Sequence, residues 1–531
     1  MLFAVDAWRC LQSIIRMSPL IRLFSHGVAA LAAVVLGSSN LCAEVKLPTL
    51  FTDHMVLQQG ASVPVWGWAD EGEKVTVQFR GQTVQATSRG GKWIVKLRNL
   101  KAGGPDTLTV SGSNRIVITD VLVGEVWAAS GQSNMEWQLK RTFEPKEAID
   151  RSANSSLRLF TVPKTKLNSP TNNINSKWVE CGPATVADFS AVAYYFGRDL
   201  QKALGVPVGM IHTSWGGSPA EAWMSEPALE GNPRYKTEVL DGYATAMNNH
   251  KSALAKWLSE EAALAKEGKK PAGNKPNPPF WRPGELYNGM IAPVIPYAIK
   301  GAIWYQGESN AGRAEQYRSL MADMISNWRQ DWGSGDFTFL QVQLAPWDRN
   351  KKRSIEEITR EPGDSDWAEL REAQWLVSRK FPKAGMAVIT DVGEKDEIHP
   401  TKKEPVGARL ALQARKIAYG QKLTAGGPIY RSMSVRGDKA TLRFENVGSG
   451  LQAVGGALKG FSIAGEDRKF VWAQAVIEGG KVIVSSPSVA KPVAVRYGWA
   501  DYPVVNLSNM EGLPASPFRT DDFPMITKGK K

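Results

Sequence analysis

The sequence contains few of the residues on which disulfide-bonded and zinc-binding proteins depend. Its 531 residues include three cysteines and five histidines. Cys10 and Cys42 lie close to the N-terminus, so Cys181 has no partner once an N-terminal leader is removed. The cysteines and histidines also lack the spacing of a zinc site. We therefore expect neither an internal disulfide nor a metal centre.

The chain also lacks a long hydrophobic run after its N-terminal region. No segment beyond residue 43 reaches about 18 consecutive apolar residues, so we expect no transmembrane helix. The apolar run at residues 27–37 is too short to span a bilayer, but it follows two arginines and precedes Ala43, a small residue at which a signal peptide can end. The sequence therefore predicts a signal peptide over residues 1–43, with Met17 as an alternative start, and export to the periplasm or the extracellular space.

The composition does not favour a nucleic-acid partner. The formal net charge is +13, and charged residues make up 22% of the chain. The lysines are spread thinly or gathered between residues 251 and 275, where Ala, Glu and Lys alternate at the spacing of a solvated helix. The sequence contains no phosphate-binding glycine loop and no RNA-binding signature. We expect no nucleic-acid partner, although the positive charge is compatible with acidic glycans.

The chain is too long for one hydrophobic core and divides into regions of different pattern. Short alternating runs separated by Gly-rich turns predict a small β domain over residues 44–120. Strand-like and helix-like segments alternate over residues 121–421, with a helical and loop insertion at about 225–285, and alternating runs return over residues 422–531. We therefore predict an α/β catalytic domain flanked by N-terminal and C-terminal β-sandwich domains.

The central region contains the elements of a mostly parallel sheet covered by helices. The predicted strands cover residues 121–129, 206–212, 299–305, 337–344 and 386–391. The predicted helices cover residues 191–204, 314–331, 366–380 and 406–419. Strands that alternate with helices form parallel sheets, and ligands bind beyond the carboxyl ends of such strands. The residues that directly follow each predicted strand are therefore the candidates for chemistry.

Ser133 follows the first of these strands in a sharp turn that begins at Gly131. Such a turn exposes the hydroxyl group and directs backbone N–H groups of the following helix at whatever the hydroxyl attacks, which favours a nucleophile. Serine is also common at helix N-caps, and that role is the alternative for Ser133.

Possible donors to an oxyanion follow the next two strands. Gly216 and Gly217 follow the second strand, and a glycine lets its backbone N–H approach a ligand closely. Gln306 follows the third strand, and its side-chain amide can donate a hydrogen bond to a developing oxyanion. Either glycine can be the backbone donor, because the sequence does not show which N–H faces inward.

A histidine with a nearby carboxylate follows the last strand. Asp396 precedes His399 by three residues, so its carboxylate can hold the imidazole Nδ1–H and leave Nε2 to accept a serine proton. Asp391, at the strand end, is the alternative partner. His212 also follows a strand, but no carboxylate lies near it in the sequence, which favours a structural role.

Four sequence blocks together resemble those of a known enzyme family. They are GQSNMEW at 131–137, SWGGSPAEAW at 214–223, WYQGESNA at 304–311 and DEIHP at 396–400. In this order they are similar to the blocks of the SGNH (GDSL-like) hydrolases, in particular the sialate O-acetylesterase-type carbohydrate esterases. Gln132 stands where the wider superfamily has aspartate, and Gln306 where it often has asparagine. Both departures are shared by the sialate-esterase branch.

The resemblance implies a three-layer α/β/α fold and a role for each matching residue. Ser133 would be the nucleophile, His399 the base and Asp396 the residue that orients the base. The oxyanion would accept hydrogen bonds from the Ser133 N–H, the Gly217 N–H and the Gln306 side chain. The resemblance implies no metal and no organic cofactor, and water as the second reactant.

The resemblance also implies the substrate and suggests the residues that line its pocket. The implied activity is removal of O-acetyl groups from carbohydrates, with sialic acids as the substrate for which the family is named. An acetyl-xylan esterase and a carbohydrate-binding protein without activity are the alternatives. Pocket candidates are Gln132, Trp137, Trp215 and Glu308, of which Glu308 also has the position of a residue that supports its loop.

Overall fold

A mostly parallel β-sheet forms the centre of the molecule. The computed structural model describes residues 44–531, so the signal peptide predicted over residues 1–43 lies outside the described residues. The sheet has the strand order β13-β12-β11-β7-β10-β8-β9, and every neighbouring pair is parallel except β8 and β9. In chain order the strands are β7 (Arg115–Gly131), β8 (Asn154–Thr161), β9 (Trp178–Cys181), β10 (Val208–Ser214), β11 (Gly301–Tyr305), β12 (Thr338–Val342) and β13 (Ala384–Ala387).

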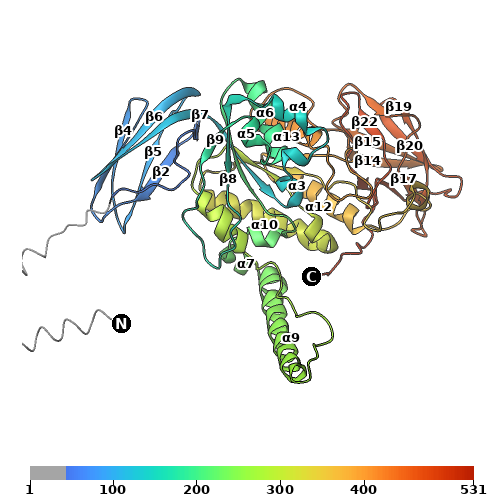
Figure 1. Ribbon diagram of the computed structural model, residues 1–531. Coiled ribbons are helices and arrows are strands. Elements are labelled where there is room, and N and C mark those ends of the chain that lie inside the picture. The colour runs from blue at the N-terminus through green and yellow to red at the C-terminus, as the bar shows by residue number, and fades with distance from the viewer. Residues whose placement is uncertain (1–43) are drawn as a thin grey trace, which may run out of the picture.

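Helices cover both faces of this sheet, as Figure 1 shows. On one face α6 (Ala191–Leu204) packs against α13 (Glu404–Ile417), and on the other α10 (Ala314–Trp332) packs against α12 (Asp366–Lys380). Alternate side chains of β7 point to opposite faces, so Trp127 belongs to the core under α6, whereas Ala128 belongs to the core under α10. These three layers confirm the predicted fold class.

The N-terminal β region is joined to the central sheet by a continuous strand. β7 is 17 residues long, and its first half pairs with β6, while its second half pairs with β10 and β11. The predicted boundary at residue 120 therefore falls inside a strand, with no linker between the two regions. The other strands of this region are β1 (Val56–Gln58), β2 (Val63–Trp68), β3 (Lys74–Phe79), β4 (Gln82–Thr87), β5 (Lys92–Leu97) and β6 (Gly103–Ser111).

A helical segment projects from the central region where an insertion is predicted. It contains α7 (Glu226–Glu230), α8 (Pro233–Tyr235), η4 (Lys236–Asp241) and the long α9 (Gly242–Ala265). No residue of α9 is buried, and Figure 1 shows this helix extending away from the rest of the molecule. Across residues 44–531, no helix is both long enough and apolar enough to cross a membrane.

The C-terminal region consists of small antiparallel sheets around a separate apolar core. Its strands are β14 (Ile429–Arg436), β15 (Lys439–Glu445), β16 (Leu451–Ala453), β17 (Phe461–Ala464), β18 (Val471–Trp472), β19 (Gln474–Glu478), β20 (Lys481–Ser485), β21 (Ala494–Tyr497), β22 (Leu507–Asn509) and β23 (Phe518–Arg519).

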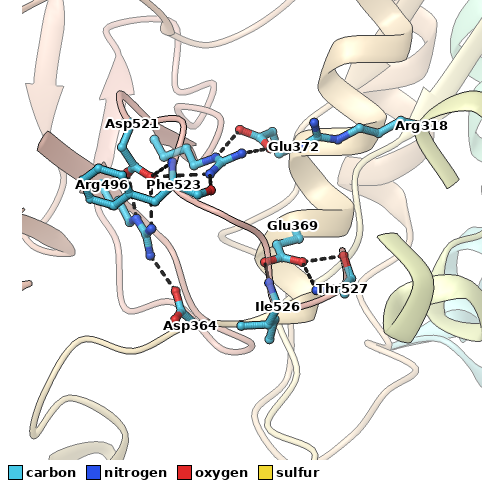
Figure 2. A network of polar contacts seen from close by, with 10 residues as sticks. Arg318, Asp364, Glu369, Glu372, Arg496, Asp521, Phe523, Ile526 and Thr527 are labelled. Carbon is cyan, nitrogen blue, oxygen red and sulfur yellow. Dashed lines mark hydrogen bonds and ion pairs between the residues drawn. The ribbon is translucent and has the colours of Figure 1, made fainter. Parts of the chain in front are cut away.

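The last residues of the chain hold this region against α12. Figure 2 shows that Glu369 of α12 accepts hydrogen bonds from the backbone N–H groups of Ile526 and Thr527, at 2.7 and 3.1 Å. The guanidinium of Arg519 is 2.8 Å from Glu372 on the same helix. Because α12 also packs on the central sheet, these contacts connect the C-terminal region to the layer that positions the candidate site.

Short helices complete the fold between these elements. They are α3 (Ser133–Glu136), η2 (Leu139–Arg141), α4 (Pro145–Asp150), α5 (Pro183–Val186), η3 (Ala220–Trp223), η5 (Tyr287–Ile291), η6 (Ala292–Val294), η7 (Glu308–Arg313) and α11 (Ile355–Ile358). Two of them, α3 and η7, directly follow the carboxyl ends of β7 and β11. They bring the first and third sequence blocks to the same edge of the sheet.

Candidate active site

The candidate nucleophile lies at the end of the central strand. β7 ends at Gly131, whose φ of +136° and close approach to β11 exclude a side chain, because a Cβ there would lie 2.2 Å from the Tyr305 carbonyl oxygen. Ser133 then begins α3 and is half-buried. The N-cap of α3 is Gln132, and Ser133 Oγ bonds to a histidine. The alternative in which Ser133 is the N-cap is therefore wrong.

His399 is in contact with this serine. Its Nε2 lies 2.8 Å from Ser133 Oγ, although the two residues are 266 positions apart in the sequence. Burial lowers the pKa of His399, and the nearby positive charge of Lys403 lowers it further. The imidazole is therefore neutral at neutral pH and available to accept the serine proton.

The structure corrects the predicted partner of the base. Glu397 places Oε1 3.2 Å from His399 Nδ1 and also accepts the His399 backbone N–H at 3.0 Å. The carboxylate of Asp396 instead pairs with Lys395 and accepts the backbone N–H of Lys352 at 3.3 Å. The tight turn pairs Glu394 with Glu397 and leaves Asp396 pointing outward, so the prediction that Asp396 orients His399 is wrong.

Asp391, the alternative partner, is also engaged elsewhere. Its two carboxylate oxygens each accept a hydrogen bond from the guanidinium of Arg409, both at 2.6 Å. This bidentate ion pair fixes α13 to the loop that follows β13, and the carboxylate of Asp391 is therefore not the partner of His399.

Two backbone N–H groups are free to stabilise an oxyanion beside Ser133. The N–H groups of Ser133 and Gly217 donate to no acceptor among residues 44–531. Gly217 has φ +76°, a conformation that favours glycine. The N–H of Gly216 is instead bound to the Glu136 carboxylate at 2.6 Å. Of the two glycines, Gly217 is therefore the one whose N–H is available.

The Gln306 side chain supports the loop that contains Gly217 and Ser218 and makes no hydrogen bond with Ser133 in the described part of the chain. Its Nε2 donates to the Ser218 carbonyl at 3.2 Å and to Asn310 Oδ1 at 2.6 Å, and its Oε1 accepts from the Tyr317 hydroxyl at 3.0 Å. The side chain is fully buried. Both amide protons are used, which contradicts the prediction that Gln306 donates directly to an oxyanion.

The predicted pocket residues have different environments. Gln132 is buried, and its Oε1 accepts N–H bonds from the η7 turn, so it braces that turn. The Trp137 ring stacks on His399, with centroids 5.0 Å apart, and is covered by the Arg141 guanidinium. Trp215 is half-exposed and packs edge-on against Trp281 at 5.6 Å. Trp137 therefore lies beside the reacting imidazole, whereas the contacts of the Trp215 ring are with Trp281.

The carboxyl group of Glu308 is buried next to Asn134, the residue that follows the serine. Its Oε1 accepts from Asn134 Nδ2 at 2.6 Å, and its Oε2 has no partner among the described residues. Burial raises the pKa of Glu308. This arrangement agrees with the predicted supporting role of Glu308.

The sequence reasoning missed four residues of the site. Asn134 and Glu136 are part of the first sequence block, and Glu397 is part of the last. Their positions in these blocks could have indicated that they belong to the site. Lys403, four residues after His399, lies outside the blocks, and no sequence pattern indicated its role.

One cluster of possible metal ligands occurs within residues 44–531, and it lies away from the serine. It consists of His54, Asp120 and Glu180. The guanidinium of Arg158 pairs with both carboxylates and lies 3.1 Å from His54 Nδ1. A fixed positive charge therefore occupies the position in which these groups would hold a cation.

Known proteins are similar to the chain over most of its length. A family described as carbohydrate esterase, sialic acid-specific acetylesterase, matches residues 271–414. The sialate O-acetylesterase of Rattus norvegicus is 30% identical over 88% of this chain and 92% of its own length. That of Homo sapiens is 29% identical over 75% of this chain and 76% of its own. The crystal structure of a carbohydrate acetylesterase from Xanthomonas citri is 38% identical, with a TM-score of 0.77, over 90% of this chain and all of the other.

Proposed function

Because the chain belongs to the sialate O-acetylesterase family of carbohydrate esterases, we propose that it hydrolyses O-acetyl esters of sialic acids at Ser133. The observation that carries the proposal is the 2.8 Å contact between Ser133 Oγ and His399 Nε2, since it gives a hydroxyl group a base within hydrogen-bonding distance.

The first half of the reaction transfers the acetyl group to the enzyme. Ser133 Oγ attacks the acetyl carbonyl carbon while His399 Nε2 takes the hydroxyl proton. Glu397 accepts the Nδ1–H and stabilises the imidazolium that forms. When the tetrahedral intermediate collapses, the carbon–oxygen bond to the sugar breaks, and His399 returns the proton to the sugar oxygen.

The negative charge of the intermediate forms next to the two free backbone donors. The N–H groups of Ser133 and Gly217 are positioned for the oxyanion, and each such donor contributes about 10²- to 10³-fold in rate. Gln306 and Gln132 keep the two loops in place through their own hydrogen bonds. Preorganised donors act without a cost of reorientation during the reaction.

The second half of the reaction restores the enzyme. A water molecule gives a proton to His399 and attacks the acetyl-Ser133 carbonyl, and acetate leaves as Oγ regains the proton. The same serine, histidine and backbone donors serve both halves.

The charges near Trp215 favour a second candidate substrate, a neutral acetylated polysaccharide such as acetyl-xylan. Phe280 is 67% exposed and packs on Trp281, which extends the aromatic surface that begins at Trp215. The two cations that lie over Trp215 are paired, Lys164 with Glu136 and Lys166 with Glu285, whereas Arg141 over Trp137 makes no ion pair among residues 44–531 and remains available to a carboxylate. Aromatic faces bind neutral sugar rings, whereas a carboxylate-bearing sugar needs a free cation.

Acetate release from matched substrates tests the proposal and separates the candidates. O-acetylated sialosides, acetyl-xylan and acetylated pectin are compared, with Ser133→Ala as the control for background hydrolysis. We expect acetate from sialosides with the wild-type chain and none above background with the variant. Release from xylan alone would favour the neutral polysaccharide, and release from no substrate would contradict an esterase function.

We also propose that the protein is exported. The support is the sequence of the first 43 residues, in which basic residues precede a short apolar run and Ala43 follows. N-terminal sequencing of the protein from its native source tests this, with Glu44 as the expected first residue. A mature protein that retains residues 17–43 would contradict export through this signal.

A further inference from the structure

A buried hydrogen-bonded bridge joins the three loops that carry the catalytic centre. Asn134, directly after the nucleophile, is fully buried. Its Nδ2 donates to Glu308 Oε1 at 2.6 Å and to the carbonyl of Ile398 at 3.0 Å, and its Oδ1 accepts from Lys403 Nζ. The amide thus connects the serine turn, η7 and the loop that presents His399.

The ammonium group of Lys403 has an unusual environment. The residue is fully buried, and burial lowers its pKa to about 7. Its Nζ lies 5.4 Å from the centre of the Tyr305 ring and 5.8 Å from that of Trp137, the ring that stacks on His399. A buried ammonium is destabilising unless it is well paired, so an ammonium held here points to a function.

The charges around Lys403 and His399 come from every element packed against them. Glu308 of η7, together with Glu394 and Glu397 of the histidine loop, attracts the ammonium. Lys403 and Arg141 of η2 oppose a positive charge on His399, whereas Glu397 favours it. Lys403 and Glu397 therefore act on the imidazole in opposite directions.

We propose that Lys403 is a positioning residue for the esterase reaction, which fixes the Asn134 amide against the histidine loop and places a positive charge against the Trp137 ring that stacks on the His399 imidazole. The inference rests on the proposed function, because it assumes that His399 is the base. Fixing Asn134 Oδ1 orients Nδ2 toward the Ile398 carbonyl, which holds the residue next to His399 at a constant distance from Ser133. Below pH 7 Lys403 is protonated, so its charge is present where protonation of the base limits the rate.

The test compares Lys403→Met with two controls. Lys403→Met removes the charge and the bond to Asn134 but keeps an unbranched chain of similar volume. Lys403→Arg keeps the charge. Lys402→Met removes the same charge from the neighbouring position, where the side chain is exposed and lies over Phe143. The readouts are the thermal unfolding midpoint and the pH profiles of kcat and kcat/KM for p-nitrophenyl acetate.

We expect the acid limb of kcat/KM to move to higher pH by about half to one pH unit in Lys403→Met, because the pKa of His399 rises when the opposing charge is removed. The plateau of kcat should fall by about tenfold or more, with KM little changed, because the Asn134 amide is no longer fixed. The acid limbs of Lys403→Arg and Lys402→Met should stay at the wild-type pH. An acid limb that does not move in Lys403→Met, or that moves equally in Lys403→Arg, would overturn the proposal.

Two further measurements separate folding and function from the role of Lys403. If Lys403→Met does not fold, Lys403→Gln tests the charge alone through the shift of the acid limb, because its amide can still donate to Asn134 without a charge. NMR titration of the His399 ring reports the same pKa change without activity. A wild-type chain with no esterase activity would overturn the proposed function, whereas an unchanged His399 titration in an active variant would overturn only the role of Lys403.

Discussion

The Glu397 carboxylate contacts His399 twice, at the ring Nδ1 and at the backbone N–H, at 3.2 and 3.0 Å. One oxygen, Oε1, makes both contacts, so the side chain sets the tautomer of the ring and the orientation of its backbone together. The hydrogen on Nδ1 then leaves the Nε2 lone pair directed at Ser133 Oγ.

Replacing Glu397 should therefore reduce activity more than replacing Asp396. We expect Glu397→Ala to lower kcat by about 10- to 100-fold, because the imidazolium formed in the reaction loses its acceptor. Asp396→Ala should keep kcat within about twofold, since this carboxylate contacts Lys395 and the Lys352 backbone. Steady-state hydrolysis of p-nitrophenyl acetate measures both, and a larger loss in Asp396→Ala would favour the partner predicted from the sequence.

The serine and the histidine should behave as one unit. Ser133→Ala and His399→Ala should each reduce kcat to near the background rate while leaving the thermal unfolding midpoint within a few degrees. In the double variant the losses should not add, because either change alone removes the activated nucleophile. Full activity in either single variant, or additive losses, would contradict the assignment.

The regular elements of the catalytic region could be predicted because local signals agree with packing. α6 covers residues 191–204, as predicted, and it starts at an N-cap serine, Ser190, and ends before Gly205 with φ +66°. β8 and β9 were not predicted. In β8 the guanidinium of Arg158 is buried because it pairs with carboxylates that are distant in the sequence. The strand therefore contains a charged residue at a buried position, which obscures the apolar pattern of a buried strand. β13 ends at Ala387, earlier than the predicted strand, which extended to residue 391.

The positions of the candidate residues could be predicted more reliably than their contacts. The blocks containing Ser133 and His399 were identified, and the structure brings them together. The direction of an individual side chain depends on partners far away in the sequence. Gln306 bonds to Ser218 and to Tyr317. In the turn from Glu394 to Glu397, the carboxylate that contacts His399 is that of Glu397 and not that of Asp396. Such contacts arise from tertiary packing and leave no local pattern.

A variant of Gln306 distinguishes between two roles of its amide, which are to stabilise the neighbouring loop and to donate directly to the oxyanion. Gln306→Ala should lower the free energy of unfolding by about 2 to 4 kcal/mol, because it leaves a cavity and an unpaired Ser218 carbonyl and removes one hydrogen bond each from Asn310 and Tyr317. Chemical unfolding measures this change. Loss of kcat with an unchanged unfolding curve would indicate instead that the amide acts directly on the oxyanion.

His212 should make the folded state sensitive to acid. Its ring is buried, Nε2 lies 2.6 Å from Ser214 Oγ, and Nδ1 has no partner among the described residues. Burial lowers its pKa from 6.5 to about 4. Between these two values the unfolded chain binds a proton that the folded chain does not. The stabilising contribution is therefore complete above about pH 6.5 and decreases as the pH falls toward 4.

The comparison with His212→Gln isolates this contribution from that of the carboxylates. The variant cannot titrate, and its amide can still bond to Ser214. Between pH 7.5 and pH 4.5, we expect the wild-type chain to lose about 2 to 3 kcal/mol more unfolding free energy than the variant, since each unit of pKa difference corresponds to about 1.4 kcal/mol. Chemical unfolding at the two pH values provides the measurement. Equal losses in the two chains would mean that His212 is protonated in the folded state at pH 4.5. Burial would then not lower the pKa of His212 as far as about 4.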